Sequence, residues 1–200
     1  MESPMDDPKN TRERILDSAL NLFSRKGYHD TRMDEIVDES ATSKGAIYFH
    51  FPSKERLFLA LMDQFADLLE RRIREAIEQE DEGMRRVQAA LTACLDTFGK
   101  YRLPAKIMLV QAVGLGAIFE KKRLEVNDRF ANLIRTYLDE AIKVGDIAPV
   151  DTEIVSHAWM GAIYSVVIRW VYTGEPEPEL ILSTLLPLLL RSVNYDDPAA

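Results

Sequence analysis

The amino-acid sequence predicts an all-α protein. Apolar residues recur at spacings of three and four along most of the chain, as they do on one face of a helix. No segment alternates apolar and polar residues over any length, as a half-buried strand would. With 200 residues the chain is long enough for one or two domains that bury a substantial core.

The first predicted helix has an apolar stripe on one side and ends at a glycine. The stripe consists of Ile15, Leu16, Ala19, Leu22 and Phe23. Arg25 and Lys26 suit the negative end of the helix dipole, and Gly27 suits the left-handed position that follows a helix. We therefore expect this helix to end at Gly27.

Two short helices are predicted next, with a tight turn between them. Thr31 is expected to cap the first, with Asp34 completing a capping box, and this helix ends near Ser40. Ala41 and Thr42 form the turn. Ser43 is the predicted N-cap of the second, which runs to about residue 49.

Longer helices are predicted for the rest of the chain. Ser53 caps a fourth helix over residues 53–79, and the polar stretch 79–83 is the expected joint between substructures. The later helices are predicted over residues 84–100, 104–120, 123–144, 151–173 and 177–193.

The order of one long and two short helices is typical of a helix-turn-helix motif, whose second short helix lies in the major groove of DNA. Ser43, Lys44, Gly45 and Ala46 would let the backbone approach the bases closely. Polar donors for the DNA backbone follow at Tyr48, His50 and Lys54, and Phe49 suits a thymine methyl group or a sugar.

The N-terminal quarter of the chain resembles the DNA-binding domain of TetR-family transcriptional regulators. The resemblance rests on three runs, residues 15–28, 31–37 and 43–57, and covers about residues 10–60. The rest of the chain agrees only in length and helical character. Two positions depart from the family pattern: Ala41 and Thr42 replace the usual Gly and Val or Ile in the turn, and Phe49 stands where Tyr, His or Trp is common.

The resemblance implies a role for each matching residue. Thr31, Arg32 and Lys54 should contact phosphates, and Tyr48 and His50 the DNA backbone. Lys44, Gly45 and Ala46 should face base edges. The expected DNA-binding residues are Thr31, Arg32, Ser43, Lys44, Gly45, Ala46, Tyr48, Phe49, His50 and Lys54.

The resemblance also implies a two-domain homodimer. We expect a DNA-binding domain over residues 1–56, a connecting helix over 53–79, and a helical ligand-binding and dimerisation domain over 57–200. Aromatic side chains with isolated polar residues suggest a ligand site, for which the candidates are Tyr101, Met108, Gln111, Trp159 and Arg169. The last helix is apolar around much of its circumference, so a second chain is its natural cover; the expected interface residues are Leu182, Leu185, Leu186 and Leu189.

The expected activity is therefore that of a ligand-responsive regulator, a repressor. It would bind a near-palindromic double-stranded operator as a homodimer and be released by a small, largely apolar effector. No cofactor, metal or catalytic residue is expected.

Composition and charge argue against several other classes of protein. The net charge of -8 argues against a nonspecific nucleic-acid binder, and residues 1–56 themselves carry 9 Lys and Arg against 11 Asp and Glu. The N-terminus lacks the apolar core of a signal peptide, and the apolar stretch at 154–168 is short and flanked by polar residues, so we expect a cytoplasmic protein without a membrane span. The single cysteine, Cys94, excludes an internal disulfide.

Two other interpretations stay open. The acidity and the altered turn fit a helical ligand-binding or interaction protein that has lost DNA binding. An all-α enzyme is the third, but one cysteine and three scattered histidines form no convincing catalytic set. Tyr48 and Phe49 also fit the core of a small helical domain.

Overall fold

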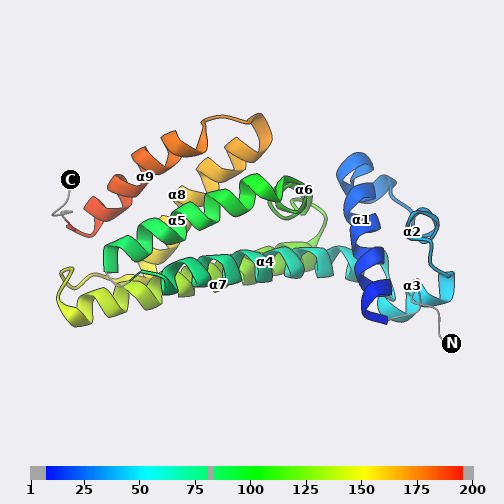
Figure 1. The fold of residues 1–200 in the computed structure, drawn as a ribbon, viewed down its shortest axis with the longest axis horizontal. Coiled ribbons are helices and arrows are strands. Elements are labelled where there is room, and N and C mark those ends of the chain that lie inside the picture. The colour runs from blue at the N-terminus through cyan, green and yellow to red at the C-terminus, as the bar shows by residue number, and fades with distance from the viewer. Residues whose placement is uncertain (1–7, 81–82, 196–200) are drawn as a thin grey trace. The chain divides into compact units, whose positions relative to one another are not determined.

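The computed structural model describes residues 8–80 and 83–195, and this part of the chain is helical with no strand, which confirms the predicted fold class (Figure 1). The elements are α1 (Pro8–Asp30), α2 (Met33–Ser40), α3 (Lys44–His50), α4 (Lys54–Glu78), α5 (Gly83–Lys100), α6 (Arg102–Lys106), the π-helix η1 (Ile107–Gln111), α7 (Ala117–Val144), α8 (Thr152–Thr173) and α9 (Pro178–Ser192).

The chain divides into two compact units. The N-terminal unit contains the described residues up to Ala66 together with Leu103–Glu120, and the C-terminal unit contains Asp67–Arg102 together with the described residues from Lys121 onward. This division differs from the predicted boundary after residue 56, because Phe58 and its neighbours at the start of α4 are buried against α1. As a functional boundary, residue 56 stays a prediction.

The core of the N-terminal unit contains the apolar stripe predicted for α1, all of which is buried. An aromatic cluster joins this stripe to later elements: the ring of Phe58 lies 5.2 Å from Phe23, 5.2 Å from Tyr28 and 5.4 Å from Phe119. Edge-to-face pairs of this kind each contribute about 0.5–1.5 kcal/mol beyond the area they bury. The cluster therefore holds α1, α4 and the first turn of α7 together.

The helix that carries the stripe ends at Gly27, which has a φ of 83° as predicted, and a short further helical segment within α1 continues to Asp30. One local prediction in this unit is wrong. The N-cap of α2 is Arg32 rather than Thr31, and the capping carboxylate is Glu35, which accepts a hydrogen bond of 3.0 Å from the Arg32 N–H. The reason is that the Thr31 hydroxyl is buried and donates to the Gly27 carbonyl at 2.7 Å.

The turn between α2 and α3 follows the prediction. Ala41 ends α2 with a left-handed φ of 49°, and the Ser43 hydroxyl oxygen accepts a hydrogen bond of 3.0 Å from the Ala46 N–H at the start of α3. Ser53 likewise accepts from the Arg56 N–H at 3.1 Å and caps α4. These short polar side chains satisfy N–H groups that have no partner within their helices.

The helix predicted over residues 104–120 is not continuous. After α6 and η1 the chain leaves the helical conformation, and Gly114 and Gly116 take left-handed φ values of 77° and 121° before α7 begins. Glycine adopts these angles without the steric cost that a side chain would impose. The predicted helices at 84–100, 151–173 and 177–193 agree with α5, α8 and α9 to within one residue at each end, whereas α7 begins six residues before its predicted start at 123.

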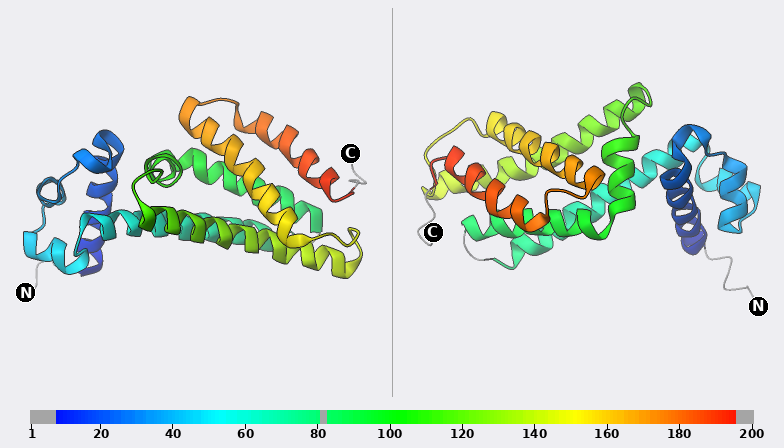
Figure 2. Two further views of the ribbon diagram at one scale, coloured as in Figure 1. Left: turned by 180° about the vertical axis from the view of Figure 1, so that it is seen from behind. Right: turned by 90° about the horizontal axis from the view of Figure 1, so that it is seen from above.

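The C-terminal unit is a helical bundle (Figure 2). α5, α8 and α9 pack against one another, and α8 and α9 form an antiparallel pair. Arg129 of α7 forms ion pairs with Asp67 and Glu70 of α4, at 2.7 Å to the Asp67 carboxylate. Among the described residues, one helix, α8, is long and apolar enough by composition to cross a membrane, but both its ends are capped by turns and its central tryptophan packs within the bundle.

Lys54 has an unusual environment at the junction of α1 and α4. Its ammonium group donates hydrogen bonds to the carbonyls of Tyr28 (2.7 Å), His29 (3.2 Å) and Thr31 (2.8 Å), and it lies 4.5 Å from the centre of the Tyr28 ring. Burial lowers the pKa of Lys54, with Asp30 acting in the opposite direction. All three donors of the ammonium group are thus used to satisfy carbonyls at the end of α1.

We expect Lys54→Met to lower the free energy of unfolding by about 1–3 kcal/mol, because it leaves carbonyls without a donor. Urea unfolding followed by circular dichroism measures the change. Lys44→Met is the matched control, since Lys44 is exposed and its substitution should change stability by less than about 0.5 kcal/mol. Equal losses for the two variants would contradict a special role for Lys54.

Candidate nucleic-acid interface and ligand cavity

The turn before α3 is held by Arg14 of α1. Its guanidinium donates to the carbonyl of Ser40 through Nε (3.3 Å) and Nη2 (3.2 Å), and to the carbonyl of Ala41 through Nη2 (3.0 Å). A cation at the C-terminal end of a helix also stabilises its dipole. Arg14 therefore fixes the turn that orients α3, a role that no pattern in the sequence indicates because it depends on a contact across 26 residues.

One face of α3 is anchored and the opposite face is exposed. Ile47 is completely buried, whereas Phe49 is 83% exposed and Tyr48 42% exposed. Lys44 and Gly45 are also exposed. The exposed part of α3 thus carries two aromatic side chains together with Lys44 and the unsubstituted backbone of Gly45.

The start of α3 is also free of steric obstruction. A Cβ atom added at Gly45 would have Ser43 Oγ as its nearest neighbour, at 3.9 Å. Glycine is therefore not required at this position by packing inside the protein. A close approach by a partner to the backbone explains it better.

Three acidic side chains of α2 form ion pairs with basic residues. Asp34 lies 2.9 Å from Lys44, Glu35 lies 2.5 Å from Lys26, and Glu39 lies 2.8 Å from Arg25. The hydrogen bond with Asp34 raises the pKa of Lys44, and the hydrogen bond with Lys26 lowers the pKa of Glu35. These exposed pairs offset much of the negative charge beside α3.

Two residues expected to contact phosphates are engaged inside the protein. Thr31 is buried with its hydroxyl bonded to Gly27, and Lys54 has all its donors on carbonyls. Arg32 is exposed at the start of α2, while Ala46 and His50 are half-buried. The pair of Lys44 with Asp34 places the first turn of α3 beside the first turn of α2, so Arg32 and Lys44 belong to one surface.

A cavity of about 490 Å³ lies within the C-terminal unit. Its walls come from the second half of α4 and from α5, α7, α8 and α9, and they are mostly apolar. The apolar lining includes Ile73, Ile77, Val87, Leu91, Phe130, Leu133, Ile134, Leu138, Ile163, Leu189 and Val193. This volume and character suit a small organic ligand.

The polar groups of the cavity are few. Tyr137, Cys94 and Trp159 line it, and the Trp159 indole N–H already donates to Ser192 Oγ at 2.9 Å. Burial raises the pKa of the Cys94 thiol to about 12, so this group is neutral. The charged lining residues are Arg86, Glu140, Lys143 and Asp146.

Of the five ligand-binding residues predicted from sequence, only Trp159 lines this cavity. Met108 and Gln111 lie in the N-terminal unit, where Gln111 Nε2 donates to the Phe23 carbonyl at 3.0 Å. Arg169 is exposed on α8, and Tyr101 follows the last residue of α5. The prediction chose isolated polar residues as ligand contacts. The cavity is instead lined mainly by the apolar stripes at residues 87–94 and 130–141, which would have indicated its position better.

Two of the four predicted interface residues of α9 do not lie at the surface of the chain. Leu185 and Leu189 are buried within the chain, and Leu182 and Leu186 are half-buried. The large apolar side chains that α8 and α9 expose are instead Ile154, Tyr172, Leu180 and Leu188, which we call the α8–α9 apolar surface. When a helix is apolar on all sides, the sequence does not show which side is buried within the chain and which side is exposed; only the packing of the folded chain shows this.

The comparisons with known proteins agree with this arrangement. Residues 15–61 match the family model described as bacterial regulatory proteins, tetR family. The HTH-type transcriptional regulator UidR of Escherichia coli strain K12 is 28% identical over 169 residues, which cover 83% of this chain and 84% of UidR. The HTH-type transcriptional activator FasR of Mycolicibacterium smegmatis is 36% identical over 85 residues, 42% of this chain and 39% of FasR.

Solved structures share the whole fold. A TetR-family regulator from Syntrophomonas wolfei superposes with a TM-score of 0.85 at 21% identity, over 97% of this chain and 100% of that one. The fatty acid degradation regulator FadR of Bacillus halodurans gives 0.83 at 18% identity, over 98% and 100%. FadR of Bacillus subtilis, solved in complex with stearoyl-CoA, gives 0.79 at 19% identity, over 92% and 99%.

The family model covers the segment from the buried stripe of α1 through α3 to the start of α4, which is the segment that carries the exposed helix face. The curated relatives are transcriptional regulators and not enzymes. Residues 15–61 therefore match the DNA-binding segment of the TetR family of bacterial transcriptional regulators, and the rest of the chain shares the fold of solved TetR-family structures.

Proposed function

We propose that this regulator binds a near-palindromic operator as a dimer, represses transcription, and is released by a small, largely apolar effector. The observation that carries DNA recognition is the exposed face of α3, with Phe49 at 83% exposure and Gly45 open to close approach. The cavity of the C-terminal unit supports the effector. α4 contributes residues to both units, so it is the element best suited to pass a change from one to the other.

The DNA contacts divide into two kinds. Lys44, Gly45 and Phe49 would face base edges, and Arg32, Tyr48 and His50 the sugar-phosphate backbone. Lys54 and Thr31 act through the fold, since their polar groups are engaged inside the protein. A mobility shift with the DNA that flanks the protein's own gene, at several salt concentrations, tests DNA binding directly; no shift at any salt would favour the interpretation that DNA binding has been lost.

Asp34 competes with DNA for Lys44. We expect Asp34→Asn to tighten operator binding by roughly two- to fivefold, the equivalent of one exposed ion pair. Asp38→Asn is the matched control, because Asp38 is an exposed acid of the same helix and the change in net charge is identical. An equal gain for both variants would mean that total charge, and not the release of Lys44, matters.

Dimerisation is proposed through the α8–α9 apolar surface. Its four large side chains lie exposed on the outer sides of two antiparallel helices, and burial against a second copy would remove them from water. The exposed residues between them on α8 include Ala158, Gly161 and Ser165, which would let two helices approach closely.

We expect Leu188→Glu to produce a folded monomer that no longer binds the operator with high affinity. Sedimentation velocity measures the oligomeric state, and thermal unfolding confirms the fold. Leu124→Glu is the control, since Leu124 of α7 is 62% exposed and Leu188 63%. A stable wild-type monomer, or dissociation caused equally by Leu124→Glu, would contradict the assignment of this surface.

The effector is proposed to be an apolar molecule held in the cavity around Trp159. The complex of the Bacillus subtilis FadR neighbour with stearoyl-CoA supports a long apolar chain as one candidate. Binding that favours one conformation weakens DNA affinity only by the difference in effector affinity between the two conformations, so tenfold release requires about 1.4 kcal/mol of coupling.

A further inference from the structure

The interior of the cavity cannot hold a charged group. Its walls are apolar apart from the Tyr137 hydroxyl, the neutral Cys94 thiol and the Trp159 indole, whose N–H is already bonded. An ion moved from water into such surroundings without a partner loses several kcal/mol of hydration free energy. Whatever part of a ligand lies inside must therefore be neutral.

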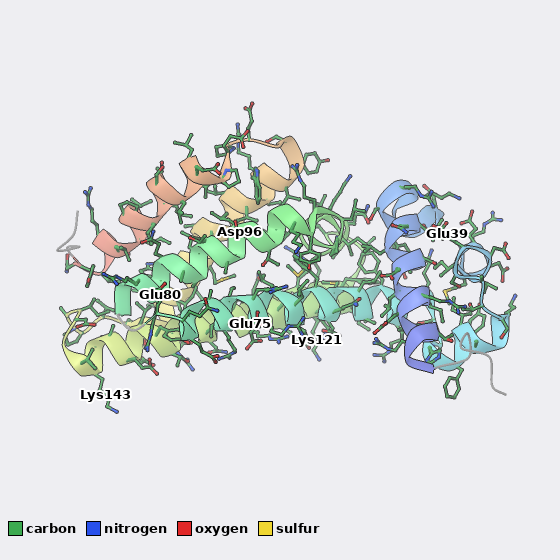
Figure 3. All side chains as sticks on the ribbon, in the orientation of Figure 1. Glu39, Glu75, Glu80, Asp96, Lys121 and Lys143 are labelled. Carbon is green, nitrogen blue, oxygen red and sulfur yellow. The ribbon has the colours of Figure 1, made fainter. Side chains whose placement is uncertain are left out.

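The charged lining residues lie together at one end of the cavity. Arg86 is close to the start of α5, and Glu140, Lys143 and Asp146 lie on the last turns of α7 and directly after it. Figure 3 shows Glu80 and Lys143 at this end of the unit, with the Lys143 side chain pointing away from the helices. The cavity is thus apolar along its length and charged at one end, which is the polarity of an amphiphile.

Arg86 differs from the other three charged residues. It is half-buried, whereas Glu140, Lys143 and Asp146 are exposed. Its Nε donates to the Glu80 carbonyl at 2.9 Å, which orients the guanidinium, and among the described residues no carboxylate pairs with it. Partly buried charges are screened less than exposed ones, so Arg86 dominates the field at this end.

A guanidinium held by Nε keeps its terminal N–H groups for a second partner, and paired donors match the oxygens of a carboxylate or a phosphate. Tyr137 lies on α7 one turn before Glu140, and its hydroxyl has no hydrogen-bond partner among the described residues. It offers a further donor on the wall near the charged end.

From this arrangement we propose that the effector is an anionic amphiphile, whose apolar tail fills the cavity and whose anionic head is bound by Arg86. The inference rests on the proposed function, because it assigns the chemistry of the ligand that the cavity takes. A carboxylate and a phosphate-bearing head share the required chemistry. A neutral or cationic amphiphile would leave the terminal N–H groups of Arg86 without an anionic partner.

The test uses Trp159 as a reporter. The chain has two tryptophans, so Trp170→Phe leaves Trp159 on the cavity wall as the single emitter. Its fluorescence is titrated with four sixteen-carbon probes below their micelle concentrations: hexadecanoate, hexadecanoyl-CoA, hexadecanol and hexadecylamine. We expect at least one anionic probe to bind about tenfold or more tightly than hexadecanol and hexadecylamine, as charge-assisted hydrogen bonds imply.

Variants assign the preference to Arg86. In the same background, Arg86→Gln should remove the advantage of the anionic probe, Arg86→Lys should keep part of it, and Arg85→Gln, an exposed neighbour outside the cavity lining, should change nothing. Hexadecanoate binding more tightly than hexadecanoyl-CoA identifies a free carboxylate head, and the reverse order identifies a phosphate-bearing head.

Two results would overturn the proposal, and they are distinguishable. Equal binding of anionic, neutral and cationic probes, or an anionic preference that survives Arg86→Gln, refutes the role of Arg86 but leaves an apolar effector in place. No fluorescence response to any of the four probes refutes the long-chain effector itself. Operator binding, measured separately by mobility shift, is unaffected by either result.

Discussion

The N-terminal unit depends on the aromatic contact between α1 and α4. The Phe58 ring meets Phe23 and Tyr28 edge-on, and Phe119 closes the cluster from the first turn of α7. The backbone leaves helical geometry at Gly27 so that Tyr28 can enter this cluster, and Lys54 then lies over the Tyr28 ring and binds the carbonyls exposed by the bend. The irregular end of α1 and the start of α4 are therefore one arrangement, stabilised by packing and by satisfied backbone groups.

The recognition helix is a consequence of that core. A helix of seven residues is too short to be stable alone, so α3 requires a buried anchor and fixed ends. Ile47 provides the anchor, Ser43 caps the first turn, and Arg14 holds the preceding turn through two carbonyls. Because these contacts hold α3 in place, the residues on its exposed face are not required for folding and can be selected for binding a partner.

The two units differ in where they place their apolar and charged side chains. The N-terminal unit places an aromatic side chain and cations in water, where paired acids moderate the charge near α3. The C-terminal unit encloses an apolar cavity within its bundle, so that an apolar molecule bound there would gain contacts with the walls and stabilise the unit.

Local patterns in the sequence were sufficient for most of the elements and for the family. Periodicity identified the helical class, Ser43 and Ser53 marked their helix starts, and the small residues before Tyr48 marked the face of α3. These features depend on neighbours within a few residues, so they can be read along the chain. Local patterns failed at Thr31, where a hydroxyl bonds backward to Gly27 and moves the cap of α2 by one residue.

Only the tertiary structure decided what each side chain is for. Lys44 and Lys54 look equivalent in the sequence, yet one is exposed and the other is enclosed by three carbonyls. Leu188 and Leu189 are neighbours in an apolar run, yet Leu188 is 63% exposed and Leu189 is buried. The position of the cavity could not be inferred from the sequence, because its walls come from five helices that lie far apart along the chain. The sequence by itself determined where helices form, since that depends on local spacing; which faces they bury and which they leave free depended on contacts between distant segments, which only the folded chain brings together.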